Sequence, residues 1–137
     1  MTDYETFDLG ATKLSCGLTV PSLHLAYKVY GQLNAQKSNL ILYPTSYGAQ
    51  HSDIDWLIGS DVVLDPARYC IVIPNQLGNG LSSSPSNLAG PFAHGRAPAF
   101  SHLDNIDAQE RLPREILGVE RIALIYGWSM GGQQALH

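Results

Sequence analysis

The sequence predicts an α/β fold in which a mostly parallel sheet is flanked by helices. Three segments, at residues 39–44, 69–74 and 121–127, carry continuous apolar runs that are typical of inner strands. Segments with helical or loop composition separate them. Strands that alternate with helices favour a parallel sheet with right-handed crossovers. A serine flanked by glycines follows the third run directly, at the edge where such sheets carry their functional groups.

The first elements are expected to be strands. Residues 23–30 alternate in polarity and are rich in strand formers, which predicts a partly exposed strand, and an irregular strand around 6–9 could pair with it. The inner strand at 39–44 comes next. A loop from Thr45 to about Asp55 follows it, and then a short helical piece near 56–59. The Asp65-Pro66 dipeptide marks a turn before the inner strand at 69–74.

The second half begins with a long stretch, residues 76–100, that is rich in Gly, Ser, Pro and Asn. A loop of this length inside a compact domain is usually functional or mobile. Ser101 or Asp104 can cap a helix that runs to about Leu117. Pro113 is expected to kink this helix or split it in two, and Gly118 to end it. The apolar positions of the helix are Leu103, Ile106, Leu112 and Ile116.

The strand at 121–127 is apolar throughout, and nothing in the sequence covers its far edge. An exposed, flat, hydrophobic edge is a template for aggregation. The helix expected after Ser129 also stops within about two turns. Residues 1–137 are therefore expected to be the N-terminal portion of one longer domain, although a partner chain that supplies the rest stays open as an alternative.

Composition excludes several classes of function. The chain is 45% hydrophobic and 15% charged, which indicates one domain with a well-buried core. Its net charge is −4 without a cluster of Lys or Arg, so nucleic-acid binding is not expected. The N-terminus is unlike a signal peptide and no apolar run reaches membrane-spanning length, which favours a cytoplasmic protein without a membrane partner. Cys16 and Cys70 lack metal-ligand spacing, and Cys70 is expected in the core.

The most specific motif is Gly127-Trp128-Ser129-Met130-Gly131, which spells G-x-S-x-G between a strand and a helix-like stretch. This order is the nucleophile elbow of the α/β-hydrolase fold. The turn that exposes the serine strains the backbone and brings strand and helix together, so glycines at 127 and 131 remove the clashes. Ser129 is the expected nucleophile, and the backbone N–H of Met130 is the expected first oxyanion donor.

The carboxyl ends of the three inner strands converge in this fold, so Thr45 and Asn75 are expected near Ser129. Thr45 is the candidate for the second oxyanion N–H, with Ser46 or an ordinary strand-ending turn as alternatives. Pro44 has no N–H and is excluded. Trp128, Ser46 and Asn75 are the candidate substrate-binding residues, although Trp128 could equally pack against a neighbouring loop.

None of the five histidines fits the triad order, in which an acid and then a histidine follow the serine. His137 lies on the elbow's own helix, and His24, His94 and His102 are expected at the surface or as helix caps. His51 with Asp53 and Asp55 is a weak metal pattern and is expected to form a polar loop near the rim of the pocket. The triad partners are thus expected beyond residue 137. Because loss of a triad histidine costs about 10⁶ in turnover, residues 1–137 alone are expected to be inactive.

Three segments together resemble the homoserine O-acetyltransferase family. Residues 25–34 (LAYKVYGQLN) are similar to its LAYETYGxLN, residues 65–78 (DPARYCIVIPNQLG) to its DTxRYFVICxNVLG, and residues 127–136 (GWSMGGQQAL) to its GGSMGGMQAL. The resemblance implies an α/β-hydrolase fold with a Ser-Asp-His triad and acyl transfer through an acyl-serine. Departures from the family pattern, among them Trp128 in place of a glycine, fall around the expected mouth of the pocket and leave the homoserine substrate open.

The function that follows is acyl transfer from acetyl-CoA, as co-substrate, to a small hydroxyl acceptor. Ester hydrolysis, with water as the acceptor, is the first alternative, and a non-catalytic binding protein of the same fold is the second. No bound cofactor or metal is expected. The expected partners are the small acyl donor and acceptor, and a homodimer stays open.

Overall fold

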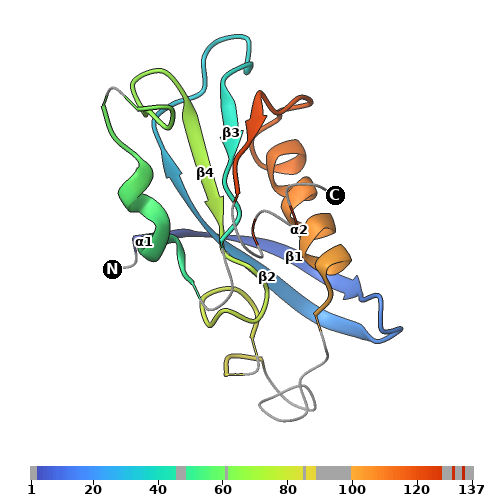
Figure 1. The fold of residues 1–137 in the computed structure, drawn as a ribbon. Helices are drawn as coiled ribbons and strands as arrows, with labels where there is room; N and C mark the ends of the chain where they lie inside the picture. The colour runs from blue at the N-terminus through green and yellow to red at the C-terminus, as the bar shows by residue number, and fades with distance from the viewer. Residues whose placement is uncertain are drawn as a thin grey trace.

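The computed structural model describes residues 3–45, 49–60, 62–84, 86–88 and 100–127, together with residues 131 and 134. Figure 1 shows the elements along the chain. They are β1 (Glu5–Lys13), β2 (Thr19–Tyr30), β3 (Leu40–Leu42), α1 (His51–Ile54), the 3-10 helix η1 (Asp55–Leu57), β4 (Cys70–Pro74), α2 (His102–Glu115) and β5 (Leu124–Ile125).

The described strands form one five-stranded sheet in the order β1-β2-β4-β3-β5. β4, β3 and β5 are parallel neighbours, as the apolar runs predict, with Leu42 opposite both Val72 and Ile125. β1 and β2 pair antiparallel with each other, and β2 pairs antiparallel with β4. The expected pairing of the first two strands is confirmed, but the described sheet is mixed rather than mostly parallel, because two of its four neighbouring pairs, β1–β2 and β2–β4, are antiparallel.

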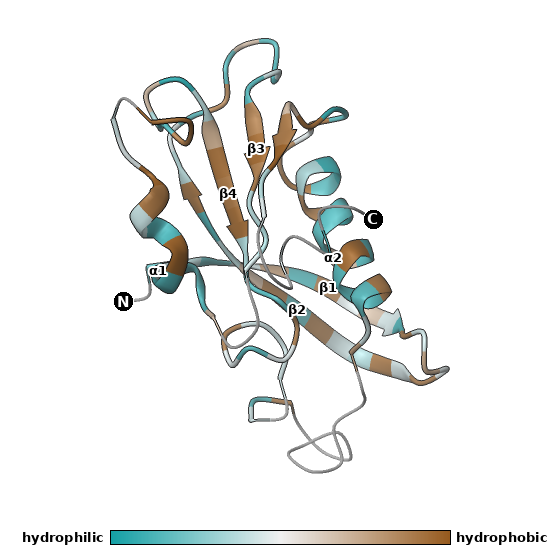
Figure 2. Cartoon of the chain, in the orientation of Figure 1, coloured by the Kyte–Doolittle hydropathy of each residue, from teal (hydrophilic) through white to brown (hydrophobic). Residues whose placement is uncertain are grey.

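The central strands β3 and β4 are hydrophobic along their length (Figure 2). Their side chains contribute to two cores, one on each face of the sheet. Leu42 and Val72 point to the face that α2 covers with Ala108 and Leu112. Ile41, Tyr43, Ile71 and Ile73 point to the opposite face, which α1 and the segment after it cover with Ile54 and Leu64. Strand side chains alternate between faces, so a continuous apolar run is what a strand covered on both sides requires. The helices therefore flank the sheet as expected.

Helix α2 begins where the sequence predicts. Ser101 is its N-cap and accepts a hydrogen bond from the Asp104 N–H at 3.1 Å, while the Asp104 carboxylate accepts from the Ser101 N–H at 2.9 Å. Pro113 does not split the helix, which continues to Glu115. Gly118 follows with a φ of +66°, the left-handed conformation that ends helices. Leu112 is buried as expected, together with Ala108, whereas Leu103 and Ile116, also expected on the apolar face, are exposed.

The predicted third inner strand is shorter in the structure than in the sequence. β5 covers only Leu124–Ile125 and lies at the edge of the described sheet, and both side chains are 42% exposed. Backbone hydrogen bonds from the Ala123 and Tyr126 N–H groups to β3 extend its pairing on either side. Within the described ranges, no helix combines the length and apolar character needed to cross a membrane.

Candidate functional site

The predicted site lies at the carboxyl ends of β3, β4 and β5. These three strands are parallel and in register, so the residues that follow them reach the same edge of the sheet. Thr45 follows β3 and Asn75 follows β4, and both residues are fully buried. Gly127, the first residue of the elbow motif, comes two residues after β5. The structure thus confirms that the strand ends named from the sequence share one edge.

Thr45 is held by its neighbour across the strand ends, Gln76. The Gln76 backbone N–H donates to the Thr45 hydroxyl at 3.1 Å, and the Gln76 side-chain amide donates to the Thr45 carbonyl oxygen. Gln76 is itself 6% exposed. None of the hydrogen bonds between described residues uses the Thr45 backbone N–H. The carbonyl and hydroxyl of Thr45 therefore both bind Gln76, and no other described residue accepts a hydrogen bond from its N–H.

The start of the elbow helix lies against the same segment. A Cβ placed on Gly131 would come within 2.7 Å of the Pro44 carbonyl oxygen and within 3.0 Å of the Thr45 carbonyl oxygen. Real Cβ atoms do not approach backbone oxygens so closely, so only glycine fits at this position. The last glycine of the G-x-S-x-G motif thus serves close approach, as the sequence predicts, and the surface it approaches is the end of β3.

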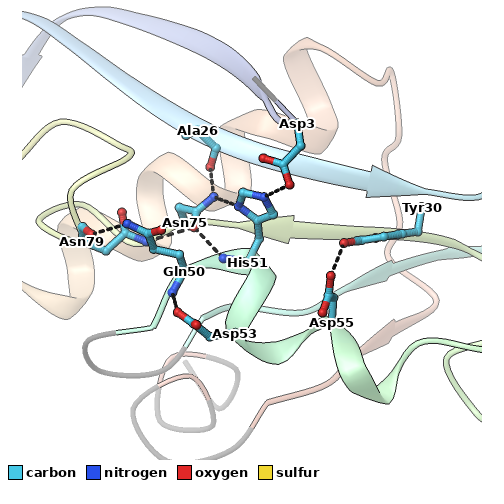
Figure 3. A network of polar contacts seen from close by, with 9 residues as sticks. All are labelled: Asp3, Ala26, Tyr30, Gln50, His51, Asp53, Asp55, Asn75 and Asn79. Carbon is cyan, nitrogen blue, oxygen red and sulfur yellow. Dashed lines mark hydrogen bonds and ion pairs between the residues drawn. The ribbon is translucent and has the colours of Figure 1, made fainter. Parts of the chain in front are cut away.

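The Asn75 side chain contacts three segments around this edge, namely β2, α1 and the loop after β4 (Figure 3). Its Oδ1 accepts from the His51 backbone N–H at 2.9 Å and from the Asn79 side chain at 3.0 Å. Its Nδ2 donates to the Ala26 carbonyl oxygen at 3.2 Å and lies 3.1 Å from His51 Nδ1. Both polar atoms of a fully buried amide are therefore satisfied within the protein. This geometry favours a role for Asn75 in holding the surrounding segments.

His51 is the first residue of α1 and is 2% exposed, so it does not lie in the polar loop that the sequence suggested. Its ring bridges Asn75 and the N-terminal Asp3, whose carboxylate lies 3.0 Å from Nε2 (Figure 3). The hydrogen bond with His51 holds the pKa of the Asp3 carboxyl below its usual value. The local signal for a helix here was Asp53, whose carboxylate accepts from the Gln50 N–H at 2.8 Å.

The acidic residues near His51 are used separately. Asp53 caps α1, while the Asp55 carboxylate accepts from the Tyr30 hydroxyl at 3.0 Å. Burial, followed by this hydrogen bond, raises the pKa of Tyr30. Among the described residues, no group of three or more His, Cys, Asp or Glu side chains is arranged to hold a metal ion.

The segment after β4 folds back on β2. The Ser82 hydroxyl accepts from the Ala26 N–H at 2.8 Å and donates to the Asn75 carbonyl oxygen at 2.7 Å. His24, expected at the surface or as a cap, instead contacts this segment with both ring nitrogens, at 3.0 Å from the Leu81 carbonyl oxygen and 3.0 Å from the Ser83 hydroxyl. His102 is half-buried as the first residue of α2.

The remaining predicted site residues lie outside the described residues. They are Ser46, Trp128, Ser129 and Met130, and the same holds for His94 and His137. The nucleophile, the first oxyanion donor and two of the three candidate substrate-binding residues, Ser46 and Trp128, therefore stay predictions. The described neighbours that bear on them are Thr45, Gln76 and Gly131.

Comparison with known proteins identifies the family. Residues 40–137, which begin with β3 and include the strand ends and the G-x-S-x-G motif, match the alpha/beta hydrolase fold family. The chain belongs to the alpha/beta hydrolase fold family. The mixed sheet with helices on both faces agrees with this assignment.

Several relatives within this alpha/beta hydrolase family are similar over nearly the whole chain. An ethyl acetate hydrolase of Pseudomonas veronii is 43% identical over 96% of the chain and 38% of its own length. The crystal structure of an acetylester hydrolase from Corynebacterium glutamicum superposes with a TM-score of 0.91 at 41% identity, again over 96% of the chain and 38% of that structure. A homoserine O-acetyltransferase of Chlorobium chlorochromatii is 35% identical over 88% of the chain and 35% of its length.

Two conclusions follow for this alpha/beta hydrolase chain. It spans less than two fifths of the length of the relatives named here. It is also more similar to the two esterases than to the acetyltransferase, so the resemblance to the homoserine O-acetyltransferase family holds at the level of a more distant relative. Ester hydrolysis, held as the alternative in the sequence analysis, is better supported than acyl transfer.

Sequence reasoning missed two residues of the site. Gln76 and Asn79 belong to a stretch that the sequence predicted only as a long loop. In the structure Gln76 contacts Thr45, after β3, and Asn79 contacts the Asn75 amide. The only local signal for Gln76 was its position two residues after β4, a strand that is apolar throughout.

Proposed function

We propose that the protein containing this chain is a serine esterase that hydrolyses acetate esters of small alcohols. The observation that carries the proposal is 43% identity to an ethyl acetate hydrolase over 96% of the chain. The G-x-S-x-G motif supports the proposal, because it supplies a candidate nucleophile shortly after β5. The parallel strands β3 and β4 end at the same edge of the sheet as β5. Thr45 supports the proposal as well, since its backbone N–H is not used by any other described residue.

The chemistry proposed begins with attack of the Ser129 hydroxyl oxygen on the ester carbonyl carbon, while its proton passes to a histidine outside these 137 residues. The backbone N–H groups of Met130 and Thr45 stabilise the oxyanion. The carbon–oxygen bond to the alcohol breaks, and the alcohol leaves with the proton from the histidine. Water, deprotonated by the same histidine, then releases acetate and restores the serine.

A second candidate is acyl transfer to homoserine or a similar hydroxyl compound. It is favoured by 35% identity to a homoserine O-acetyltransferase over 88% of the chain, and by the three motif segments quoted above. The two functions share the acetyl-serine and differ only in whether water or an alcohol reaches it. A direct competition between acceptors therefore distinguishes them.

The test uses the protein in full length. Purified enzyme is given ethyl acetate, or acetyl-CoA, with and without homoserine, and free acetate and O-acetylhomoserine are quantified. An esterase releases acetate from ethyl acetate at a rate that homoserine does not change. Predominant formation of O-acetylhomoserine from acetyl-CoA would favour the transferase.

The control variant is Ser129→Ala. Replacing the nucleophile of a triad lowers turnover by about 10⁶, so either activity should disappear with it. If neither substrate is turned over in a manner that depends on Ser129, the non-catalytic alternative replaces both.

A further inference from the structure

The segment that joins β3 to α1 is held at both ends by two consecutive residues that follow β4. At its beginning, Thr45 is bound by Gln76 through the hydroxyl and the carbonyl oxygen. At its end, the His51 backbone N–H donates to Asn75 at 2.9 Å. Close to that end, Asn79 donates to the Ala49 carbonyl oxygen at 3.2 Å and accepts from the Gln50 side chain at 3.3 Å. Thr45 and His51 are therefore both fixed by residues that follow β4.

The contact to the Thr45 carbonyl has a directional consequence. A peptide unit is planar and trans, so its C=O and its N–H point in opposite directions. Gln76 holds the carbonyl of the peptide unit that follows Thr45, and its backbone N–H holds the Thr45 hydroxyl. Together these contacts fix the side chain and the carbonyl of Thr45, and thus the position of its backbone nitrogen. The Thr45 N–H belongs to the preceding peptide unit, whose Pro44 carbonyl oxygen lies against Gly131.

Gly131 lies against the same stretch of backbone. It approaches the Pro44 and Thr45 carbonyl oxygens so closely that a Cβ would overlap with them. The Thr45 carbonyl oxygen is thus contacted by both Gln76 and Gly131, and a shift of this backbone towards Gly131 would require the glycine to move. Because Gln76 is 6% exposed and Thr45 is fully buried, water does not readily replace the amide if it is lost.

From this geometry we propose that Gln76 is a positioning residue, which orients the backbone donor at Thr45 for the oxyanion of the acyl-transfer step. Asn75 supports it by fixing the far end of the same segment. This inference rests on the proposed function, since it needs an oxyanion to form. Gln76 does not touch the substrate in this account and acts only through Thr45.

The decisive variant is Gln76→Met, which keeps the length and approximate volume of the side chain and removes the amide donor. The expected result in the full-length enzyme is a fall in kcat of roughly 10- to 100-fold, because deletion of an oxyanion donor outright costs about 10²–10³ and misorientation should cost less. KM for the acetate ester should change little. A trifluoromethyl ketone, which adds to the serine and forms an oxyanion, should bind more weakly by the same factor as kcat/KM falls.

The matched control is Asn39→Ala. The Asn39 side chain donates to the Gln32 and Arg68 carbonyl oxygens at 3.1 Å each, so it also binds backbone, but at the amino end of β3. This variant should lower stability without selective loss of kcat or of ketone affinity. A second variant, Thr45→Val, removes the hydroxyl that the Gln76 N–H contacts and preserves the shape of the side chain. It should lower kcat in the same direction as Gln76→Met, whereas Thr45→Ser should retain activity.

The outcomes separate the two levels of inference. If wild-type enzyme shows no Ser129-dependent turnover, the proposed function fails. If wild-type is active but kcat and ketone affinity stay within about threefold of wild type in Gln76→Met, the positioning role is wrong. Should Gln76→Met fail to fold, as judged by circular dichroism, Thr45→Val decides: unchanged kcat in that variant, or an equal loss in Asn39→Ala, overturns the proposal.

Discussion

Asn75 and His51 are joined by two hydrogen bonds of opposite direction. The His51 backbone N–H donates to Asn75 Oδ1 at 2.9 Å, and Asn75 Nδ2 lies 3.1 Å from His51 Nδ1. Because an amide nitrogen can only donate, we assign Nδ1 as the acceptor, with the imidazole proton on Nε2 facing Asp3. The amide orientation is fixed independently, since Asn79 donates to the same Oδ1. One buried amide thereby determines the tautomer of one buried imidazole.

This relationship predicts the effect of Asn75→Asp. The new carboxylate oxygen would face the Ala26 carbonyl oxygen and His51 Nδ1, both of which are acceptors in the native arrangement. Leaving buried polar groups without partners costs about 1–3 kcal/mol, and more for a charged group. We therefore expect Asn75→Asp to be less stable than Asn75→Ala. Urea denaturation of wild type and both variants measures this, and equal stability of the two variants would contradict the assignment.

Gly131→Ala is expected to disturb the contact between the elbow helix and the end of β3. Its Cβ would lie 2.7 Å from the Pro44 carbonyl oxygen and 3.0 Å from that of Thr45, and backbone atoms cannot yield as a flexible side chain can. Overpacking of this kind costs about 1–3 kcal/mol. We expect a lower Tm together with a lower kcat. Gly59→Ala is the control, since in the described part of the chain its Cβ would meet no heavy atom within 4 Å and it should leave both quantities unchanged.

Alkaline pH should weaken the fold through Tyr27. This side chain is 4% exposed and its hydroxyl donates to Glu5 at 2.8 Å; burial, and then this hydrogen bond, raises its pKa to about 12. The folded protein then retains the phenolic proton when the unfolded chain has lost it. The associated stability is complete below pH ~10 and is lost as the pH rises towards ~12. Unfolding free energies across this window should fall less steeply for Tyr27→Phe, and parallel slopes would contradict the effect.

The two cysteines should react differently with thiol reagents. Cys16 is exposed, while Cys70 is 2% exposed within β4 and burial raises the pKa of its thiol. The reactive species is the thiolate, so both accessibility and charge favour Cys16. Under native conditions at neutral pH, iodoacetamide followed by peptide mapping should find label on Cys16 and none on Cys70. Denaturant should make both reactive, and native labelling of Cys70 would show that β4 is not covered as described.

A polypeptide of residues 1–137 should lack esterase activity. After Ser129 these residues contain one histidine and no acid, so the proposed nucleophile has no triad base in the required order. Without a triad histidine, turnover falls by about 10⁶. Assays with a chromogenic acetate ester on the purified polypeptide and on its Ser129→Ala variant should give the same background rate. A faster rate that depends on Ser129 would mean that one of the five histidines serves as the base.

Local sequence was sufficient for the parts of this chain that depend on neighbouring residues. The apolar runs at 40–43 and 70–74 predicted the central strands because a strand covered on both faces must be apolar at every position. Ser101 or Asp104 was predicted to cap α2, and the structure shows that the two form a capping box, which involves only residues three positions apart. The G-x-S-x-G motif predicted the family, and residues 40–137 match it.

The sequence was less informative where a contact joins distant segments. His51 reads as part of a polar loop, yet it is buried because Asn75, 24 positions later, satisfies both its backbone and its ring. Likewise, the sequence gives Gln76 only as one residue of a long loop. It lies 31 positions after Thr45, and the pairing of β3 with β4 brings the two within hydrogen-bond distance. The sequence by itself determined the two central strands, the start of α2 and the family. The tertiary structure alone decided which buried amides bind which backbone groups, because those partners are brought together by sheet register and not by separation along the chain.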